Sequence, residues 1–271
     1  MSTAPPVAAV VRPRPAGLGS PSYHCHAAYG WLRGDGEADM VSVHRRTPFW
    51  YALTEGRRAE LRSLGVVRGY PAEAVLVHER DDSDFAIVLL DGCVKVSSHA
   101  RRGYQAVLAL RDAGDIVGEL AGLDGDGRSA TLTALTPVEA LLVPADRLRA
   151  FLRSCPEAAE IVQRIVTVRL READRLRAAT GAESVAQRLA VLLLDLGRRY
   201  GVREAAGGLL IELPLSQSDL AGLVLTSQRT LVRTLEHWRE QGWVVTGRRS
   251  ILITGAGRAA LAEGSRIQMS R

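Results

Sequence analysis

Two short segments near the middle of the chain carry side chains that could bind a sugar and a phosphate together. The first is Gly118-Glu119-Leu120-Ala121, and the second begins with Arg128-Ser129, nine positions after the glutamate and beyond a glycine-rich turn. A carboxylate accepts hydrogen bonds from sugar hydroxyls, and a guanidinium holds a phosphate through two parallel charge-assisted bonds. A helical turn between them would point free backbone N–H groups at the same anion. A cyclic nucleotide combines a ribose and a single anionic phosphate in one rigid ligand, so it is the ligand that this pattern predicts.

The two segments also resemble the phosphate-binding cassette of the cyclic-nucleotide-binding domain family. Residues 90–96, with the sequence Leu-Asp-Gly-Cys-Val-Lys-Val, resemble a hairpin of the same family, in which Gly92 suits a turn with positive φ. The resemblance implies that Glu119 accepts a bond from the ribose 2′-hydroxyl and that Arg128 and Ser129 hold the cyclic phosphate. The alternative is a retained β-roll whose pocket is empty or holds another metabolite.

Short apolar runs of β type, separated by turn signals, surround the cassette. They are Val75–Val77, Phe85–Leu90, Val94–Val96, Ala106–Leu110 and Ala130–Val143. Many short strands at even spacing predict a β-roll of the jelly-roll kind. Helical spacing of apolar residues predicts a helix over Phe49–Leu64 before the first strand.

A long amphipathic helix follows the predicted roll. It begins at Pro156, which suits the first helical position, and no breaker appears before about Ala179. Its apolar stripe, which includes Ile161, Ile165 and Val168, either packs on its own domain or forms a parallel two-helix dimer seam. Residues 180–182, Thr-Gly-Ala, are the predicted hinge.

The C-terminal part has the pattern of a helix, a strand, two further helices and a β-hairpin. An apolar helix is predicted over Val185–Tyr200, and Ser216 is a good N-cap with Asp219 at the third helical position. A second helix is predicted over Thr226–Glu240, and a two-stranded wing surrounds Arg248. This order resembles the winged helix-turn-helix of the cyclic-AMP receptor protein and fumarate–nitrate regulator (Crp/Fnr) superfamily, which implies an α+β protein that binds DNA.

The resemblance identifies Thr226–Glu240 as the recognition helix, whose N-terminal residues reach base edges. Gln228 and Arg229 stand where the family has Arg and Glu, and these side chains prefer different bases, so we expect a different half-site. Leu225 stands where the family often has the turn glycine. The predicted DNA contacts are Ser216, Gln217, Thr226, Ser227, Gln228, Arg229, Thr230, Arg233, Arg248 and Arg249.

The purine end of the predicted ligand site departs from the family. In the cyclic-AMP receptor proteins, a Thr-Ser pair on the long dimer helix contacts adenine. Alignment at residues 187–190 puts Ala173 and Asp174 at that position, and both are included in the predicted site. Cyclic AMP is the first candidate ligand, and cyclic GMP, another nucleotide and a weakened site remain alternatives.

Charge is concentrated in the C-terminal quarter. Residues 198–271 contain 11 Arg and 6 acidic residues, so they carry the whole formal net charge of +5. This asymmetry favours a polyanionic partner for the C-terminal domain. A solvated basic surface is the other interpretation.

Further patterns limit the class of protein. The chain has no GxSxG motif, P-loop, metal-ligand cluster or paired catalytic carboxylates, so we expect neither an enzyme nor a metal site. Three scattered cysteines predict no disulfide framework. Without a run of eighteen apolar residues or a signal peptide, no membrane contact is expected and the predicted location is cytoplasmic.

The predicted organisation has five parts. They are a disordered extension (1–47), a cyclic-nucleotide-binding β-roll (48–155), a dimerisation helix and hinge (156–182), a winged helix-turn-helix domain (183–263) and a tail (264–271). The predicted partners are palindromic double-stranded DNA and a second copy of the chain, with RNA polymerase as a candidate. A regulator that binds DNA without any nucleotide is the competing hypothesis.

Overall fold

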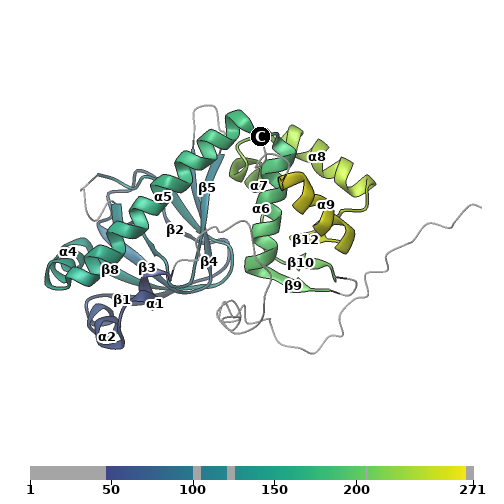
Figure 1. Ribbon diagram of the computed structural model, residues 1–271. Helices are drawn as coiled ribbons and strands as arrows, with labels where there is room; N and C mark the ends of the chain where they lie inside the picture. The colour runs from purple at the N-terminus through teal and green to yellow at the C-terminus, as the bar shows by residue number, and fades with distance from the viewer. Residues whose placement is uncertain (1–46, 100–104, 121–125, 205–206, 267–271) are drawn as a thin grey trace, which may run out of the picture.

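The computed structural model of the protein describes residues 47–99, 105–120, 126–204 and 207–266. Figure 1 shows a β-roll, a long helix that crosses it and a smaller C-terminal domain beside it. This arrangement confirms the predicted α+β fold class. The predicted disordered extension lies outside the described residues except for Thr47.

The β-roll consists of two four-stranded antiparallel sheets, in the orders β1-β8-β3-β6 and β2-β7-β4-β5. The strands are β1 (Val66–Tyr70), β2 (Val75–Val77), β3 (Phe85–Asp91), β4 (Cys93–His99), β5 (Gln105–Asp112), β6 (Ile116–Val117), β7 (Thr131–Ala134) and β8 (Val138–Pro144). The predicted run over Ala130–Val143 is thus two strands, and β1 and β6 were not predicted.

Both faces of strand β3 are buried, and its side chains alternate between two cores. Ile87 and Leu89 pack between the sheets, whereas Ala86 and Val88 face the helices that cover the roll. Because successive side chains of a strand point to opposite faces, a strand buried on both sides is apolar at every position. This explains the continuous apolar run of Phe85–Leu90 in the sequence.

The turn at Gly92 has the positive φ that the sequence predicted, at 84°. The prediction of a hairpin there is wrong, because β3 and β4 belong to different sheets and do not pair. An added Cβ at Gly92 would overlap the carbonyl oxygen of Pro137, so this turn also requires close backbone approach. The glycine therefore serves to pass the chain from one sheet to the other.

Helices α1 (Phe49–Ala52), α2 (Glu55–Ser63), α4 (Ala145–Ser154) and α5 (Pro156–Ala182) flank the roll. The single helix predicted over Phe49–Leu64 is interrupted at Leu53, and Thr54 caps α2 by accepting a bond from the backbone N–H of Arg57. Thr54 favours this break because its side chain satisfies an N–H group at the start of a helix.

Helix α5 is 27 residues long and continues through the predicted hinge at residues 180–182. The backbone N–H of Glu183 donates to the carbonyl of Ala179 at 2.8 Å, and the helix ends only there. The break comes at Ser184, which starts the next helix with a capping box that includes Gln187. A capping side chain thus outweighs the low helix propensity of Gly181 in deciding where the helix ends.

The C-terminal domain has its own apolar core and a four-stranded sheet in the order β11-β12-β10-β9. Its elements are α6 (Val185–Tyr200), β9 (Gly201–Arg203), β10 (Leu209–Ile211), α7 (Gln217–Leu223), α8 (Gln228–Glu240), β11 (Val244–Gly247), β12 (Ser250–Ile253) and α9 (Gly255–Arg266). Helix α9 was not predicted, and it extends the domain past the predicted boundary at residue 263. Its glycines lower its helix propensity, and the burial of Leu261 against α6 compensates for this.

The turn between α7 and α8 contains a strained residue. Leu225 has φ of 51°, in the left-handed region that favours glycine. Replacement of Leu225 by glycine should raise the free energy of unfolding by about 0.5–1 kcal/mol, because relief of the strain exceeds the added entropy of the unfolded chain. Urea denaturation of the two proteins measures this difference. A lower midpoint for Leu225→Gly would show that side-chain packing matters more than the backbone strain.

Candidate functional site

The guanidinium of Arg128 is held inside the roll by three donated hydrogen bonds. Nε donates to Ser83 Oγ at 2.9 Å, Nη1 to the Gly118 carbonyl at 3.0 Å and Nη2 to the Phe85 carbonyl at 2.6 Å. The Phe85 ring lies 4.7 Å from the guanidinium carbon. Because a guanidinium has five N–H groups, one N–H on each terminal nitrogen remains for an anion. Burial lowers the pKa of Arg128, but an arginine remains charged at neutral pH.

Gly118 allows the guanidinium to approach the backbone. Its φ is 68°, and an added Cβ would overlap Nη1 of Arg128. A side chain at this position would therefore displace the arginine that the sequence assigned to the phosphate. The residues present fit an anion held at the guanidinium, since Gly118 allows the arginine its position and two of its N–H groups have no hydrogen-bond partner among the described residues.

Glu119 is 3% exposed and accepts a hydrogen bond from Arg169 Nη1 at 2.6 Å. Nη2 of the same arginine donates to the carbonyl of Ile116 at 2.7 Å. Arg169 belongs to α5, so this residue ties the cassette to the long helix. We did not predict Arg169, although it stands two helical turns after Val162, which is buried against the roll. A cation on the buried face of an amphipathic helix is the signal that could have found it.

The remaining cassette residues are more accessible. Leu120 is 43% exposed, and Glu119 and Leu120 are helical in conformation. Ser129 is exposed and makes no hydrogen bond within the described residues, so its hydroxyl is available to a ligand. Ala121 lies outside the described residues.

Ala173 and Asp174 lie on the exposed C-terminal half of α5. Asp174 pairs with Arg177, one helical turn further on, at 3.4 Å. An exposed pair of this kind contributes little to stability. Within one chain these two residues therefore face solvent.

The first helix of the helix-turn-helix, α7, has Ser216 as its N-cap, as the sequence predicted. Ser216 Oγ accepts a bond from the backbone N–H of Asp219, and the Asp219 carboxylate accepts one from the backbone N–H of Ser216. This reciprocal pair is a capping box. Ser216 and Gln217 are exposed at the helix start, where backbone N–H groups suit a phosphate.

The recognition helix α8 begins at Gln228, two residues later than predicted, because Ser227 is its N-cap. Ser227 Oγ also lies 2.9 Å from the hydroxyl of Thr230, while Thr226 belongs to the turn. Gln228, Arg229 and Arg233 are exposed. Over the described residues, neither arginine has a hydrogen bond or an ion pair. The structure thus leaves the predicted base-contacting side chains accessible.

The tip of the wing carries Arg248 and Arg249 between β11 and β12. Arg248 is exposed, whereas Arg249, with φ of 65°, forms an ion pair with Glu73 of the roll. Both partners of this pair are more than half exposed, so it can open at low cost. A phosphate contact by Arg249 requires that it opens.

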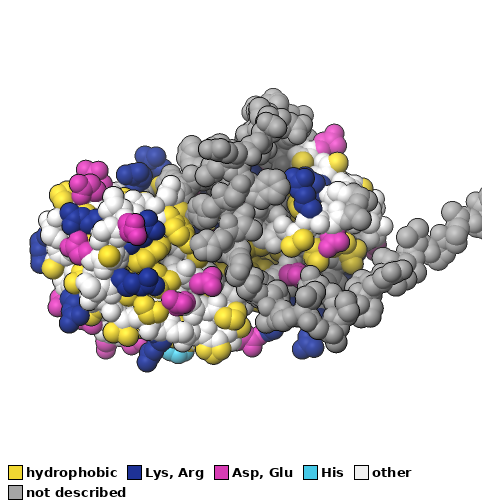
Figure 2. Space-filling view, turned by 90° about the horizontal axis from the view of Figure 1, so that it is seen from below, with side chains coloured by type: hydrophobic (Ala, Val, Ile, Leu, Met, Phe, Trp, Pro, Cys, Tyr) yellow, Lys and Arg dark blue, Asp and Glu magenta, His cyan; other side chains and the backbone are white. Residues whose placement is uncertain are grey.

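The charge of the roll differs from that of the C-terminal domain. Figure 2 shows Lys and Arg side chains interspersed with Asp and Glu over the part of the roll that this view exposes. A surface with mixed signs does not concentrate a field for a polyanion. By the count along the sequence, the formal excess of positive charge lies in residues 198–271.

A β-roll with a buried arginine cassette, joined by a long helix to a winged helix-turn-helix, defines a two-domain DNA-binding regulator. Residues 67–155 match the cyclic nucleotide-binding domain family, and residues 187–262 match the Crp-like helix-turn-helix domain family. The chain belongs to the Crp/Fnr superfamily of transcription regulators. This family consists of transcription regulators and not enzymes, which confirms the expectation from the sequence.

Two curated relatives illustrate the likeness. The chain is 29% identical over 191 residues to the CRP-like cAMP-activated global transcriptional regulator of Mycobacterium tuberculosis, covering 70% of this chain and 85% of that protein. It is 26% identical over 190 residues to the global nitrogen regulator of a Nostoc species, covering 69% of this chain and 85% of that protein.

Among solved structures, the c-di-GMP responsive global regulator CLP of Xanthomonas campestris has the same fold. Its TM-score is 0.68 at 20% identity, and the match covers 74% of this chain and 100% of that one.

Among the helices in the described ranges, none has the length and apolarity that crossing a lipid bilayer requires.

Proposed function

We propose that the protein is a homodimeric transcription regulator whose affinity for DNA is controlled by a cyclic nucleotide in the cassette. The observation that carries this proposal is the position of Arg128. Its guanidinium is buried beside Gly118, is aligned by three hydrogen bonds and retains two free N–H groups. Glu119 would accept a hydrogen bond from the ribose hydroxyl at Oε2, the carboxylate oxygen that does not accept from Arg169.

Cyclic AMP is the first candidate, because the relatives include several whose names describe them as cAMP-activated. A specific observation favours a second candidate, a pocket with another ligand or none. Arg128 already has three partners in the protein, so the fold does not require an anion to satisfy it. In addition, Asp174 replaces a hydroxyl with a carboxylate where the family contacts adenine.

Isothermal titration calorimetry separates these candidates. We expect cyclic AMP to bind the intact protein more tightly than cyclic GMP does, with a stoichiometry of one per chain. Both nucleotides should be tested beside cyclic di-GMP on the same preparation. If none of the three produces heat of binding, the proposal of nucleotide control is wrong, and DNA affinity should then be the same with and without nucleotide.

Homodimerisation is proposed from the accessible apolar face of α5. Val162 and Val166 line a groove between α4 and α5, and Leu170, the next residue of this row, is 60% exposed. Residues four apart lie on one helix face, so the row continues the groove into the exposed half of the helix. A second copy of α5 would cover this row, and two recognition helices would then meet successive major grooves about 34 Å apart.

Replacement of Leu170 by aspartate tests the dimer. A charge in a buried apolar seam is expensive, so we expect dissociation at concentrations where the unmodified protein is dimeric. Sedimentation velocity gives the mass of each species. Val66 on β1 is 69% exposed and lies outside α5, so Val66→Asp is the matched control that should remain dimeric. A dimer that persists in Leu170→Asp would contradict the assigned seam.

A further inference from the structure

The winged domain of the chain is docked on the β-roll of the same chain. Helix α7 lies against strand β5, as Figure 1 shows. Three buried roll residues, Cys93, Leu110 and Leu135, belong to the same apolar cluster as the core of the C-terminal domain. The two domains therefore share a continuous apolar contact.

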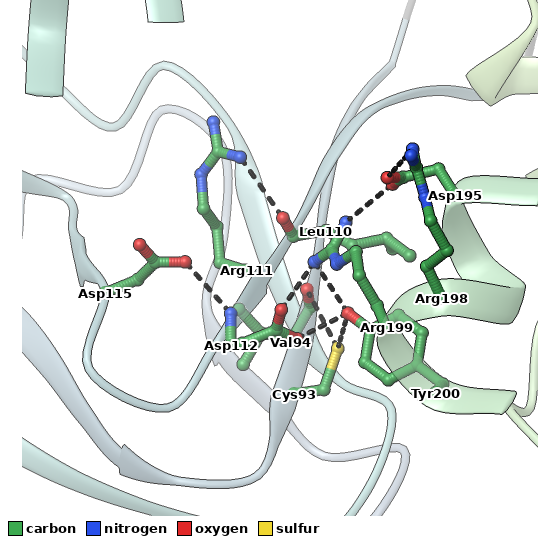
Figure 3. Close-up of polar contacts among 10 residues, drawn as sticks. All are labelled: Cys93, Val94, Leu110, Arg111, Asp112, Asp115, Asp195, Arg198, Arg199 and Tyr200. Atoms are coloured by element: carbon green, nitrogen blue, oxygen red, sulfur yellow. Dashed lines mark hydrogen bonds and ion pairs between the residues drawn. The ribbon is translucent and has the colours of Figure 1, made fainter. Parts of the chain in front are cut away.

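A polar cluster stands at the edge of this contact. It consists of Cys93 and Asp112 from the roll and Arg199 and Tyr200 from the end of α6, and it is called the docking cluster below (Figure 3). The Asp112 carboxylate accepts one bond from Arg199 Nη2 and one from the Tyr200 hydroxyl, both at 2.5 Å. Arg199 Nη2 also donates to the Tyr200 hydroxyl at 2.7 Å, and Cys93 Sγ lies 3.7 Å from that oxygen.

The docking cluster is protonated in a way that suits these bonds. Burial raises the pKa of Tyr200 well above its ordinary value, so its hydroxyl remains a donor. Burial raises the pKa of Cys93 in the same way. For Arg199, burial opposes the charge, but Tyr200 and Asp112 outweigh it and the pKa is raised. Partly buried charge-assisted bonds of this geometry are stronger than exposed ion pairs.

A second ion pair joins α7 to the roll. Lys95, the one lysine of the chain, donates to Asp219 Oδ1 at 2.6 Å, and the two side chains are 14% and 7% exposed. The other oxygen of Asp219 accepts bonds from the backbone N–H and the hydroxyl of Ser216. One carboxylate thus caps the first DNA-binding helix and attaches it to β4.

The docking cluster is adjacent to the ligand cassette. The backbone N–H of Asp112 donates to Asp115 Oδ2 at 3.0 Å. Burial raises the pKa of Asp115, and the charges of Arg111 and Arg169 partly offset this. Arg169 is the residue that binds Glu119. A ribose bonded to Glu119 would share that carboxylate with Arg169, so the path from a ligand to Asp112 runs through Glu119, Arg169 and Asp115.

We propose that the docking cluster and the Lys95–Asp219 pair clamp the winged domain to the roll in a state with reduced affinity for DNA. In this state Arg249 is paired with Glu73 and must leave it before it can contact a phosphate, which adds a small cost because both side chains are exposed. The clamp also fixes the orientation of α7 and α8 relative to the dimer helix. A regulator controlled by a ligand needs two such states with different affinities. The inference rests on the proposed function in one respect, because it assumes that the protein binds DNA and that docking lowers its affinity for DNA.

The decisive variant is Arg199→Gln, with Arg198→Gln as its matched control. Arg198 is the neighbouring arginine of α6, and it pairs with Asp195 of the same helix at 3.2 Å rather than with the roll. Both substitutions remove one positive charge from the winged domain, which by itself weakens binding to DNA. A gain in affinity for Arg199→Gln therefore indicates release of the domain.

DNA affinity is measured by fluorescence anisotropy, without nucleotide, on a duplex selected from a random-sequence library with the wild-type protein. We expect Arg199→Gln to bind roughly 5- to 30-fold more tightly than wild type, and Arg198→Gln to bind equally or more weakly. Tyr200→Phe removes only a hydroxyl and should produce a smaller gain in the same direction, so it serves if Arg199→Gln does not fold. Equal or weaker binding by both Arg199→Gln and Tyr200→Phe overturns the proposal.

Hydrogen–deuterium exchange tests docking independently of any nucleotide or DNA. The amides of β5 and α7 should exchange faster in Arg199→Gln than in Arg198→Gln, while those of β3 remain unchanged. Equal exchange in β5 and α7 for the two variants shows that the cluster does not hold the domains together and overturns the clamp. If calorimetry finds no nucleotide binding but exchange is faster, the clamp stands and only nucleotide control fails.

Discussion

Replacement of Arg128 by alanine should abolish nucleotide binding and also destabilise the roll. The ligand would lose two charge-assisted bonds, which predicts a fall in affinity of at least about 100-fold. The carbonyls of Gly118 and Phe85 would lose their donor, and we expect the free energy of unfolding to fall by about 2–4 kcal/mol. Calorimetry with cyclic AMP and urea denaturation measure the two effects.

Because Arg128→Ala alters both stability and binding, a second substitution must separate them. Ser129 is exposed and has no partner within the described residues, so Ser129→Ala should leave stability unchanged. Loss of one hydrogen bond to the phosphate should lower affinity by about 2- to 10-fold. Unchanged affinity in Ser129→Ala, or nucleotide binding that survives in folded Arg128→Ala, would contradict the assignment of the phosphate site.

Replacement of Arg229 by alanine should relax the base preference at one position of each half-site. Arg229 lies in the first turn of α8, is exposed and has no competing contact within the described residues. A bidentate contact from arginine to guanine contributes about 1–3 kcal/mol of discrimination, so the preferred base should lose about 5- to 160-fold of its advantage. Selection from a random-sequence library with each protein reports the preference position by position.

Arg248→Ala is the control for this experiment, because Arg248 lies at the exposed tip of the wing. A phosphate contact has no sequence preference, so its loss should weaken all sequences alike and reduce the salt slope by about 1 per chain. If Arg229→Ala behaves in the same way as Arg248→Ala, then Arg229 contacts phosphate and another side chain selects the base. Gln228 would be the next candidate.

Local sequence patterns predicted many elements correctly. The bounds of α6, the N-cap at Ser216 and the wing around Arg248 follow from helix periodicity, capping side chains and turn residues, which act over a few positions. The sequence also showed that Leu225 stands where the family often has the turn glycine, and Leu225 has the positive φ that favours glycine. Strand β1 and helix α9 were missed because packing on distant segments stabilises them, through β8 and α6 respectively.

The partners of the candidate site residues were beyond local patterns. Ser83 and Phe85 lie more than 40 positions before Arg128, and Arg169 lies 50 positions after Glu119. Such pairs depend on the order of strands in two sheets and on where α5 crosses them. For the same reason Gly92 was assigned to a hairpin, although the turn connects strands of opposite sheets.

By itself the sequence determined the kinds of chemistry in this protein: a carboxylate and a guanidinium at cassette spacing, a recognition helix with Gln228 and Arg229, and a basic winged domain. Only the tertiary structure decided that Arg128 is aligned by the protein, that Arg169 links Glu119 to α5, and that Asp112 receives Arg199 and Tyr200 from the other domain. The physical reason is the range of the interactions. Side-chain type and short spacing are local properties, whereas burial and pairing arise when the chain brings distant segments together.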